Sequence, residues 1–92
     1  MGTAIVTLRI MPESPSIDLK KIEHEALKLI VEFSDDRPKK TDVQPVAFGL
    51  QSVNITFLMD EKKGGTDALE EKISKIEGIQ SVECTDVRRI IG

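Results

Sequence analysis

Hydrophobic and polar residues alternate strictly at the start of the chain. Within residues 4–11, the apolar positions of one face are Ala4, Val6, Leu8 and Ile10. Pro12 then removes a backbone donor and ends the pattern. The clearest alternation comes later, over residues 53–59, where Val53, Ile55, Phe57 and Met59 share one face. Both segments predict β-strands with one buried face.

The spacing changes to three and four residues between these strands, as in an amphipathic helix. The apolar positions on its predicted buried face are Leu19, Ile22, Ala26, Leu29, Ile30 and Phe33. Asp18 precedes them and is the predicted N-cap, with Ile17 and Ile22 expected to form a hydrophobic staple. We expect the helix to end near Phe33, before a polar connection over residues 34–40.

Weaker patterns complete the chain. Residues 43–48 predict a short strand that pairs with residues 53–59 as a hairpin, with Gly49 breaking the pattern between them. Thr66 is predicted to cap a second helix, and Gly78 to take the left-handed position just after that helix. The inward residues of this second helix are predicted to be Leu69, Ile73 and Ile76.

Residues 79–91 predict the last strand. Its inward positions, Val82 and Cys84, do not continue in step to Val87. One extra residue would explain the change of parity, so we expect a bulge or bend near Thr85 and Asp86.

The resulting order of strand, helix, strand, strand, helix, strand predicts an α+β fold. It is typical of a ferredoxin-like βαββαβ sandwich, in which a four-stranded antiparallel sheet carries both helices on one face. The other face is expected to be half-polar and to face solvent or a partner, with Asn54, Thr56, Glu83 and Thr85 on it. With 92 residues and no linker, we expect a single domain over residues 1–92.

Charge and composition exclude several kinds of partner. The net charge is −3 and aromatic residues make up 3% of the chain, so nucleic acid is an unfavourable direct partner. No apolar run has the length of a bilayer span, and the N-terminus does not resemble a signal peptide. We therefore predict a cytoplasmic protein without membrane contact.

The chain is poor in residues that carry catalysis or bind metals. It has one histidine, His24, on the polar helix face, and one cysteine, Cys84, which is expected in the core. The sequence Gly64-Gly65-Thr66 lacks the Walker pattern of a phosphate loop. The acidic pairs at residues 35–36 and 60–61 lack the spacing of a calcium loop. We predict no enzyme activity, no bound metal and no cofactor.

Two features of the chain are not explained by folding alone. The first is Phe48, which lies between small residues at the expected hairpin bend and suits either a core contact or a binding role. The second is the basic pair Arg88 and Arg89 near the C-terminus, which could simply be a charged strand end that resists edge pairing.

Four stretches of the chain resemble the elongation factor 1-beta family, the exchange factors for the GTPase elongation factor 1-alpha. They are residues 6–14 (VTLRIMPES), 45–50 (PVAFGL), 65–71 (GTDALEE) and 85–90 (TDVRRI). The resemblance extends over essentially the whole chain, and its length fits the archaeal form, which consists of the exchange domain alone.

The resemblance implies a guanine-nucleotide exchange factor that binds elongation factor 1-alpha and is monomeric when free. In eukaryotic relatives, the aromatic of the PVAFGL-like motif contacts the second domain of the GTPase, a role that would fall on Phe48. A lysine near their C-terminus is directed at the magnesium and phosphate region. Arg89 is the matching position, and Arg88 could share or replace its role. The alternative is a small-molecule-binding regulatory module on the same fold.

Overall fold

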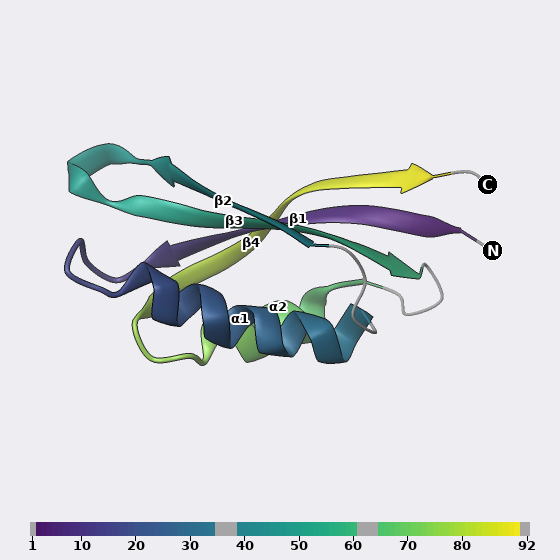
Figure 1. Ribbon diagram of the computed structural model, residues 1–92, viewed down its shortest axis with the longest axis horizontal. Helices are drawn as coiled ribbons and strands as arrows, with labels where there is room; N and C mark the ends of the chain where they lie inside the picture. The colour runs from purple at the N-terminus through teal and green to yellow at the C-terminus, as the bar shows by residue number, and fades with distance from the viewer. Residues whose placement is uncertain (1, 35–38, 61–64, 91–92) are drawn as a thin grey trace.

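A computed structural model describes residues 2–34, 39–60 and 65–90 of the protein (Figure 1). The elements in chain order are β1 (Thr3–Pro12), α1 (Leu19–Ser34), β2 (Lys39–Pro45), the short 3-10 turn η1 (Ala47–Gly49), β3 (Gln51–Asp60), α2 (Asp67–Ser74) and β4 (Ile79–Ile90). The order of helices and strands agrees with that predicted from the hydrophobic pattern.

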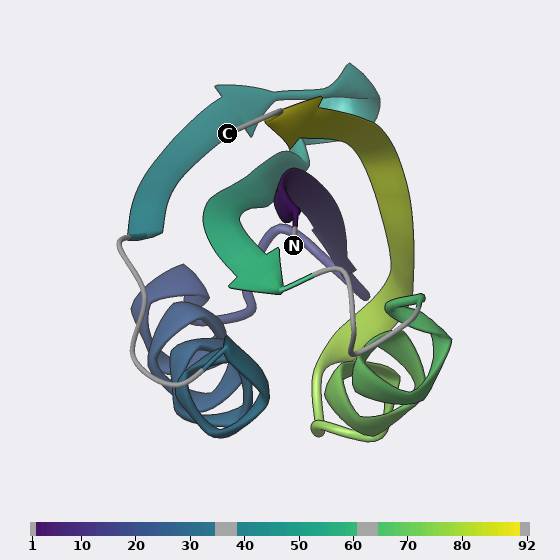
Figure 2. The same cartoon turned by 90° about the vertical axis from the view of Figure 1, so that its right-hand side faces the viewer.

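The strands form one antiparallel sheet in the order β2-β3-β1-β4, with β1 and β3 at its centre. Figures 1 and 2 show α1 and α2 side by side on one face of this curved sheet. No described helix covers the other face. This is the predicted ferredoxin-like arrangement, in which β1 and β3 are neighbours although α1 and β2 separate them along the chain.

The core lies between the central strands and the two helices. Along β1, buried residues alternate with half-buried ones from Thr3 to Pro12. The buried hydrophobic residues are Ala4, Val6, Leu8, Ile10, Ile22, Ala26, Ile30, Val53, Ile55, Phe57, Met59, Leu69, Ile73 and Ile79. This set contains every residue predicted to face inward from the two central strands. The rings of Phe33 on α1 and Phe57 on β3 pack in a T-shaped arrangement, with a centroid distance of 6.5 Å and an interplanar angle of 88°.

The start of α1 was predicted correctly. The Asp18 carboxylate accepts hydrogen bonds from the backbone N–H groups of Lys20 at 3.0 Å and Lys21 at 3.4 Å. These bonds satisfy donors that have no partner within the first turn. The cap fixes where the helix begins, and the buried face of Ile22, Ala26 and Ile30 then follows at the expected spacing.

Three details of α2 differ from the prediction. Thr66 lies at the N-cap position, but its hydroxyl caps no backbone N–H and instead donates to the Glu70 carboxylate at 2.7 Å. The helix ends at Ser74, so Ile76 packs against the core from the following turn. Gly78 has a φ of 95°, but it lies beyond the C-cap residue Lys75, in the turn that leads into β4. A short helix followed by a tight turn was not distinguishable from a longer helix by periodicity.

The face without helices is half-polar, as predicted. The hydroxyls of Thr7 and Thr56 lie 3.1 Å apart across β1 and β3, and Arg9 forms a 4.0 Å ion pair with Glu83 across β1 and β4. Asn54 is half-buried on the same face. These pairs satisfy polar groups on a sheet surface that also carries apolar residues such as Ile5 and its partner Leu58.

Candidate partner-binding site

Phe48 lies at the tip of the β2–β3 hairpin and is almost completely exposed. Its relative accessibility is 94%, and its φ of 63° places it in the left-handed region that bulky residues rarely adopt. Two backbone hydrogen bonds close the loop around it: Val46 N–H donates to the Leu50 carbonyl at 2.7 Å, and Leu50 N–H donates to the Ala47 carbonyl at 3.3 Å. The loop holds an apolar ring in solvent in a costly backbone conformation, a combination typical of binding sites.

The structure corrects one expectation about this segment and decides between two alternatives that the sequence left open. β2 ends at Pro45 and not at residue 48, because the chain turns over residues 47–49 before β3 begins. A core contact for Phe48, which the sequence pattern left open, is contradicted by its exposure. Gly49, which follows with a φ of 76°, completes the reversal in a conformation that suits glycine.

The expected irregularity in β4 is a bulge at Thr85. Leu8 pairs with Cys84 and Thr7 pairs with Asp86, so Thr85 has no opposite residue on β1. A second irregularity near Gln80, between the pairs Met11–Ser81 and Pro12–Ile79, was not predicted. Because of this extra residue, each later residue of β4 points to the opposite face of the sheet from the one that strict alternation would give.

Arg88 and Arg89 lie on opposite faces of the sheet, and the bulge decides which face each of them takes. Arg89 pairs with Ala4 and Val87 with Val6, so both lie on the face that carries the helices. Arg88 pairs with Ile5 on the other face, where its Nε donates to the Asp86 carboxylate at 3.0 Å. The two arginines, which the sequence left interchangeable, therefore have different surroundings.

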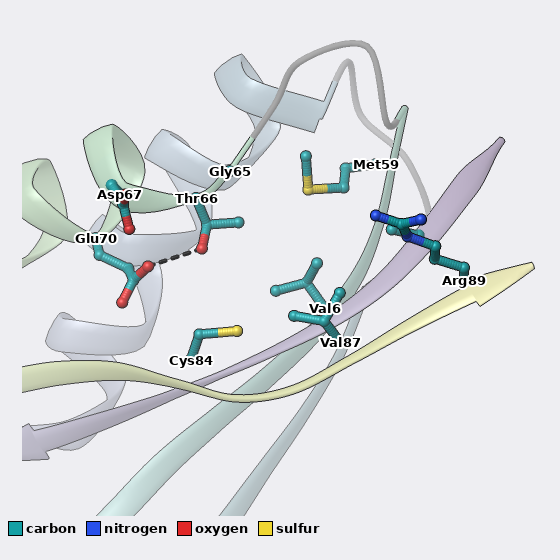
Figure 3. Close-up of a pocket in the computed structure, with 10 residues that line it drawn as sticks. Val6, Met59, Gly65, Thr66, Asp67, Glu70, Cys84, Val87 and Arg89 are labelled. Carbon is teal, nitrogen blue, oxygen red and sulfur yellow. Dashed lines mark hydrogen bonds between the residues drawn. The ribbon is translucent and has the colours of Figure 1, made fainter. Parts of the chain in front are cut away.

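Arg89 borders an open pocket of about 450 Å³ between β4 and the start of α2 (Figure 3). The pocket is lined by Ala4, Val6, Met59, Gly65, Thr66, Asp67, Glu70, Cys84, Val87 and Arg89. In Figure 3 the Arg89 guanidinium points back over the strands toward Met59, while the Thr66–Glu70 pair lies on the opposite wall. The pocket thus has an apolar floor with a cation on one side and carboxylates on the other.

Cys84 lies in this pocket and is half-buried, as its inward parity predicted. Burial, which disfavours the thiolate, raises the pKa of the Cys84 thiol above its ordinary value. A thiol of this kind is a weak nucleophile at neutral pH. This fits the predicted packing role of Cys84.

The β2–β3 hairpin tip, which carries Phe48, and the C-terminal end of β4, which carries Arg89, lie at opposite ends of the molecule (Figure 1), whose longest dimension is 42 Å. Ala4 pairs with Met59 on one side and with Arg89 on the other, so Arg89 lies at the same height in the sheet as Met59, near the end of β3. Phe48 lies beyond Gln51, the first residue of β3. At ~3.3 Å per residue, the sheet separates them by on the order of 25 Å. The structure therefore does not bring the predicted site residues together, and a single partner would have to contact both ends.

The structure collects the four quoted stretches at these two ends. Pro15, the residue that follows the stretch 6–14, approaches the hairpin tip formed by residues 45–50. The start of residues 65–71 and the end of residues 85–90 line the pocket beside Arg89. Sequence reasoning missed this pocket, which depends on how distant segments pack. It also missed the left-handed Phe48, which depends on the exact backbone path of the hairpin loop.

Other predictions about chemistry are only partly covered. Among residues 2–34, 39–60 and 65–90, no group of three or more His, Cys, Asp and Glu side chains is placed to hold a metal ion. The acidic pair at residues 35–36 lies outside the described residues, as does residue 61 of the second pair. No helix in the described ranges combines the length and the apolar character that a bilayer crossing requires.

Comparison with known proteins gives a consistent result over the full chain. A family model described as the EF-1 guanine nucleotide exchange domain matches residues 5–90. Two proteins named elongation factor 1-beta are similar to this chain: the one from Methanothermobacter thermautotrophicus is 41% identical and the one from Methanobrevibacter smithii is 39% identical. Both alignments cover 99% of this chain and 100% of the relative.

Similar solved structures share the fold. The ACT domain from GTP pyrophosphokinase of Chlorobium tepidum has a TM-score of 0.54 and 20% identity, covering 87% of this chain and 95% of that one. The designed protein Foldit4 has a TM-score of 0.54 and 15% identity, covering 99% of this chain and 97% of that one. At these identities the likeness concerns the fold alone.

Proposed function

The chain belongs to the EF-1 guanine nucleotide exchange domain family, and on this premise we propose that it promotes GDP release and GTP loading on elongation factor 1-alpha. The observation that carries the proposal is the match of the family model to residues 5–90, which includes both candidate contact regions. Such a factor works in the cytoplasm, where translation takes place. It makes and breaks no covalent bond.

The two ends of the molecule would divide the work. Phe48 anchors the factor to the GTPase, because an exposed ring held in a fixed loop loses little conformational freedom on binding. Arg89, on the opposite end and on the helix-bearing face, approaches the magnesium and phosphate region. Arg88 stays on the other face, paired with Asp86.

Exchange requires the factor to bind the nucleotide-free GTPase more tightly than the nucleotide-bound form. A thousandfold faster GDP release corresponds to a barrier lowered by about 4 kcal/mol. A guanidinium inserted beside the phosphates competes with magnesium for the oxygens that bind it, and loss of magnesium removes the main counter-charge of the phosphates. Because the coupling between the two binding events is reciprocal, binding of a new nucleotide lowers the affinity of the GTPase for the factor, and the factor dissociates.

Arginine at position 89 affects how the insertion works. Its planar guanidinium donates along two directions, whereas a lysine ammonium is a compact point charge. The guanidinium would therefore bridge two oxygens and not replace magnesium at its centre. We expect Arg89→Lys to keep much of the exchange activity, because both side chains supply the positive charge.

The test is the release rate of fluorescent GDP from the elongation factor 1-alpha of the same organism, with substoichiometric amounts of the protein. We expect a large catalytic acceleration that declines as free magnesium is raised. A matched sample with EDTA and no factor gives the rate that magnesium loss alone produces. A folded protein that leaves the release rate unchanged would overturn the proposal.

A further inference from the structure

The first of the four stretches, residues 6–14, has no role in the proposed contacts, although its last residues lead into an exposed loop. This loop over residues 13–18 connects β1 to α1 and lies against the hairpin tip. A Cβ atom built on Gly49 would lie 3.9 Å from Cγ of Pro15, which is ordinary van der Waals contact. Pro15 and Phe48 therefore belong to neighbouring loops, although 32 residues separate them in the chain.

We propose that Pro15 is a second contact residue beside Phe48, and that together they form one apolar surface for the protein partner. We call this the tip surface; its exposed residues are Pro15, Pro45, Ala47 and Phe48. Its occupant is an apolar pocket on the GTPase, so the identity of the partner depends on the proposed function.

The loop that carries Pro15 is held in place on both sides. Glu13 N–H donates to the Gly78 carbonyl at 2.9 Å, which ties the loop to the start of β4. Ile17 N–H donates to the Ser14 carbonyl at 3.3 Å, and the hydroxyls of Ser14 and Ser16 lie 2.9 Å apart. These bonds turn the loop back on itself with Pro15 at its outer edge, where it is exposed. A preformed surface of this kind pays less ordering entropy on binding.

The composition of the tip surface identifies its partner as an apolar part of a protein. Residues 44–51 carry no charge in a chain in which 32% of residues are charged. The loop over residues 13–18 carries only the acidic Glu13 and Asp18, so neither loop offers the basic groups that a phosphate backbone would require. An aromatic ring flanked by proline and alanine instead suits a concave apolar pocket, in which a few central residues supply most of the binding energy.

The test measures two quantities on the same samples: binding of fluorescently labelled protein to nucleotide-free elongation factor 1-alpha, and acceleration of GDP release. For Pro15→Ser we expect roughly fivefold weaker binding with an unchanged maximal exchange rate, because the change removes apolar contact far from Arg89. Pro15→Glu should weaken binding further, since it places a charge in the apolar contact. Combined with Phe48→Ala, Pro15→Ser should have a smaller effect than alone, because adjacent contacts are coupled.

Val43→Ser is the matched control, because Val43 is also an exposed apolar residue, with 42% accessibility, but lies in β2 and not in either loop. Thermal unfolding of each variant confirms that the fold is kept. Binding by both Pro15 variants at the level of the Val43→Ser control would overturn the tip surface. If the unaltered protein binds without accelerating release, only the exchange function fails. If it does not bind at all, both proposals fail.

Discussion

The hairpin tip and the C-terminal end of β4 are built by different physical means. At the tip, two hydrogen bonds and a glycine hold Phe48 in a left-handed conformation, so the backbone aims the side chain. At the end of β4, the backbone stays extended, and a single extra residue at Thr85 decides which face each arginine takes. The first device stores local strain, whereas the second only changes the register.

The two ends also differ in the interaction that they offer. The tip is uncharged and apolar, and contacts of this kind contribute to affinity almost regardless of salt. The pocket beside Arg89 has charges on both sides, and in the proposed mechanism the Arg89 guanidinium competes with magnesium. We therefore expect variants at the tip to change how tightly the partner binds, and variants at Arg89 to change the rate at saturation.

The largest expected effect is that of Arg89→Ala on the maximal rate of GDP release. We expect a roughly hundredfold loss, on the scale seen when one group that stabilises charge in a transition state is removed. Arg89→Lys is the control and should retain most of the rate. An Arg89→Ala variant with full activity at saturation would contradict the insertion of this side chain.

The next effect concerns Phe48→Ala. The concentration of the factor that gives half-maximal GDP release should rise about thirtyfold, as expected when about 2 kcal/mol of binding free energy is lost at a central aromatic contact. The plateau rate should not change. Phe48→Gly provides a matched comparison, because it removes the same ring but also relieves the left-handed strain. Chemical denaturation should show the Gly variant to be more stable than the Ala variant by about 1 kcal/mol. Equal stability would mean that Phe48 stores no strain.

Asp18→Ala tests whether stability and exchange are separable. Loss of its two hydrogen bonds to the first turn of α1 should lower the free energy of unfolding by about 1 kcal/mol. Exchange at a temperature well below the unfolding transition should stay within about twofold, because Asp18 belongs to neither predicted contact. A large loss of exchange in a folded Asp18→Ala variant would show that the contact at the hairpin end extends along the loop over residues 13–18.

The smallest expected effect is that of Arg88→Ala. Its ion pair with Asp86 is exposed, and pairs of this kind contribute about 0–1 kcal/mol to stability. We expect the exchange rate to change less than about twofold, in contrast to Arg89→Ala. A loss equal to that of Arg89→Ala would mean that the faces assigned by the bulge at Thr85 do not decide the role of the arginines.

The strands and helices were largely predictable because their periodicity is encoded locally. The alternation from Ala4 to Ile10 and the three-and-four spacing of α1 both appear in the core as expected. Element ends were less predictable, as the early end of β2 at Pro45 and of α2 at Ser74 illustrates. The Thr66 hydroxyl donates to the Glu70 carboxylate and does not accept from a backbone N–H of the first turn. Both groups lie within its reach, and the residue pattern does not predict which of them it binds.

The sequence by itself determined the fold class, the inward faces of the central strands and the parity break at Thr85, because side-chain direction follows residue spacing within one element. It also contained the family resemblance, which rests on short stretches and not on their positions in space. Only the tertiary structure decided the exposure of Phe48, the pairing of Arg89 with Ala4 and the contact between the loops of Pro15 and Gly49. These features depend on strand register and on loop packing between distant segments, and no local pattern specifies either.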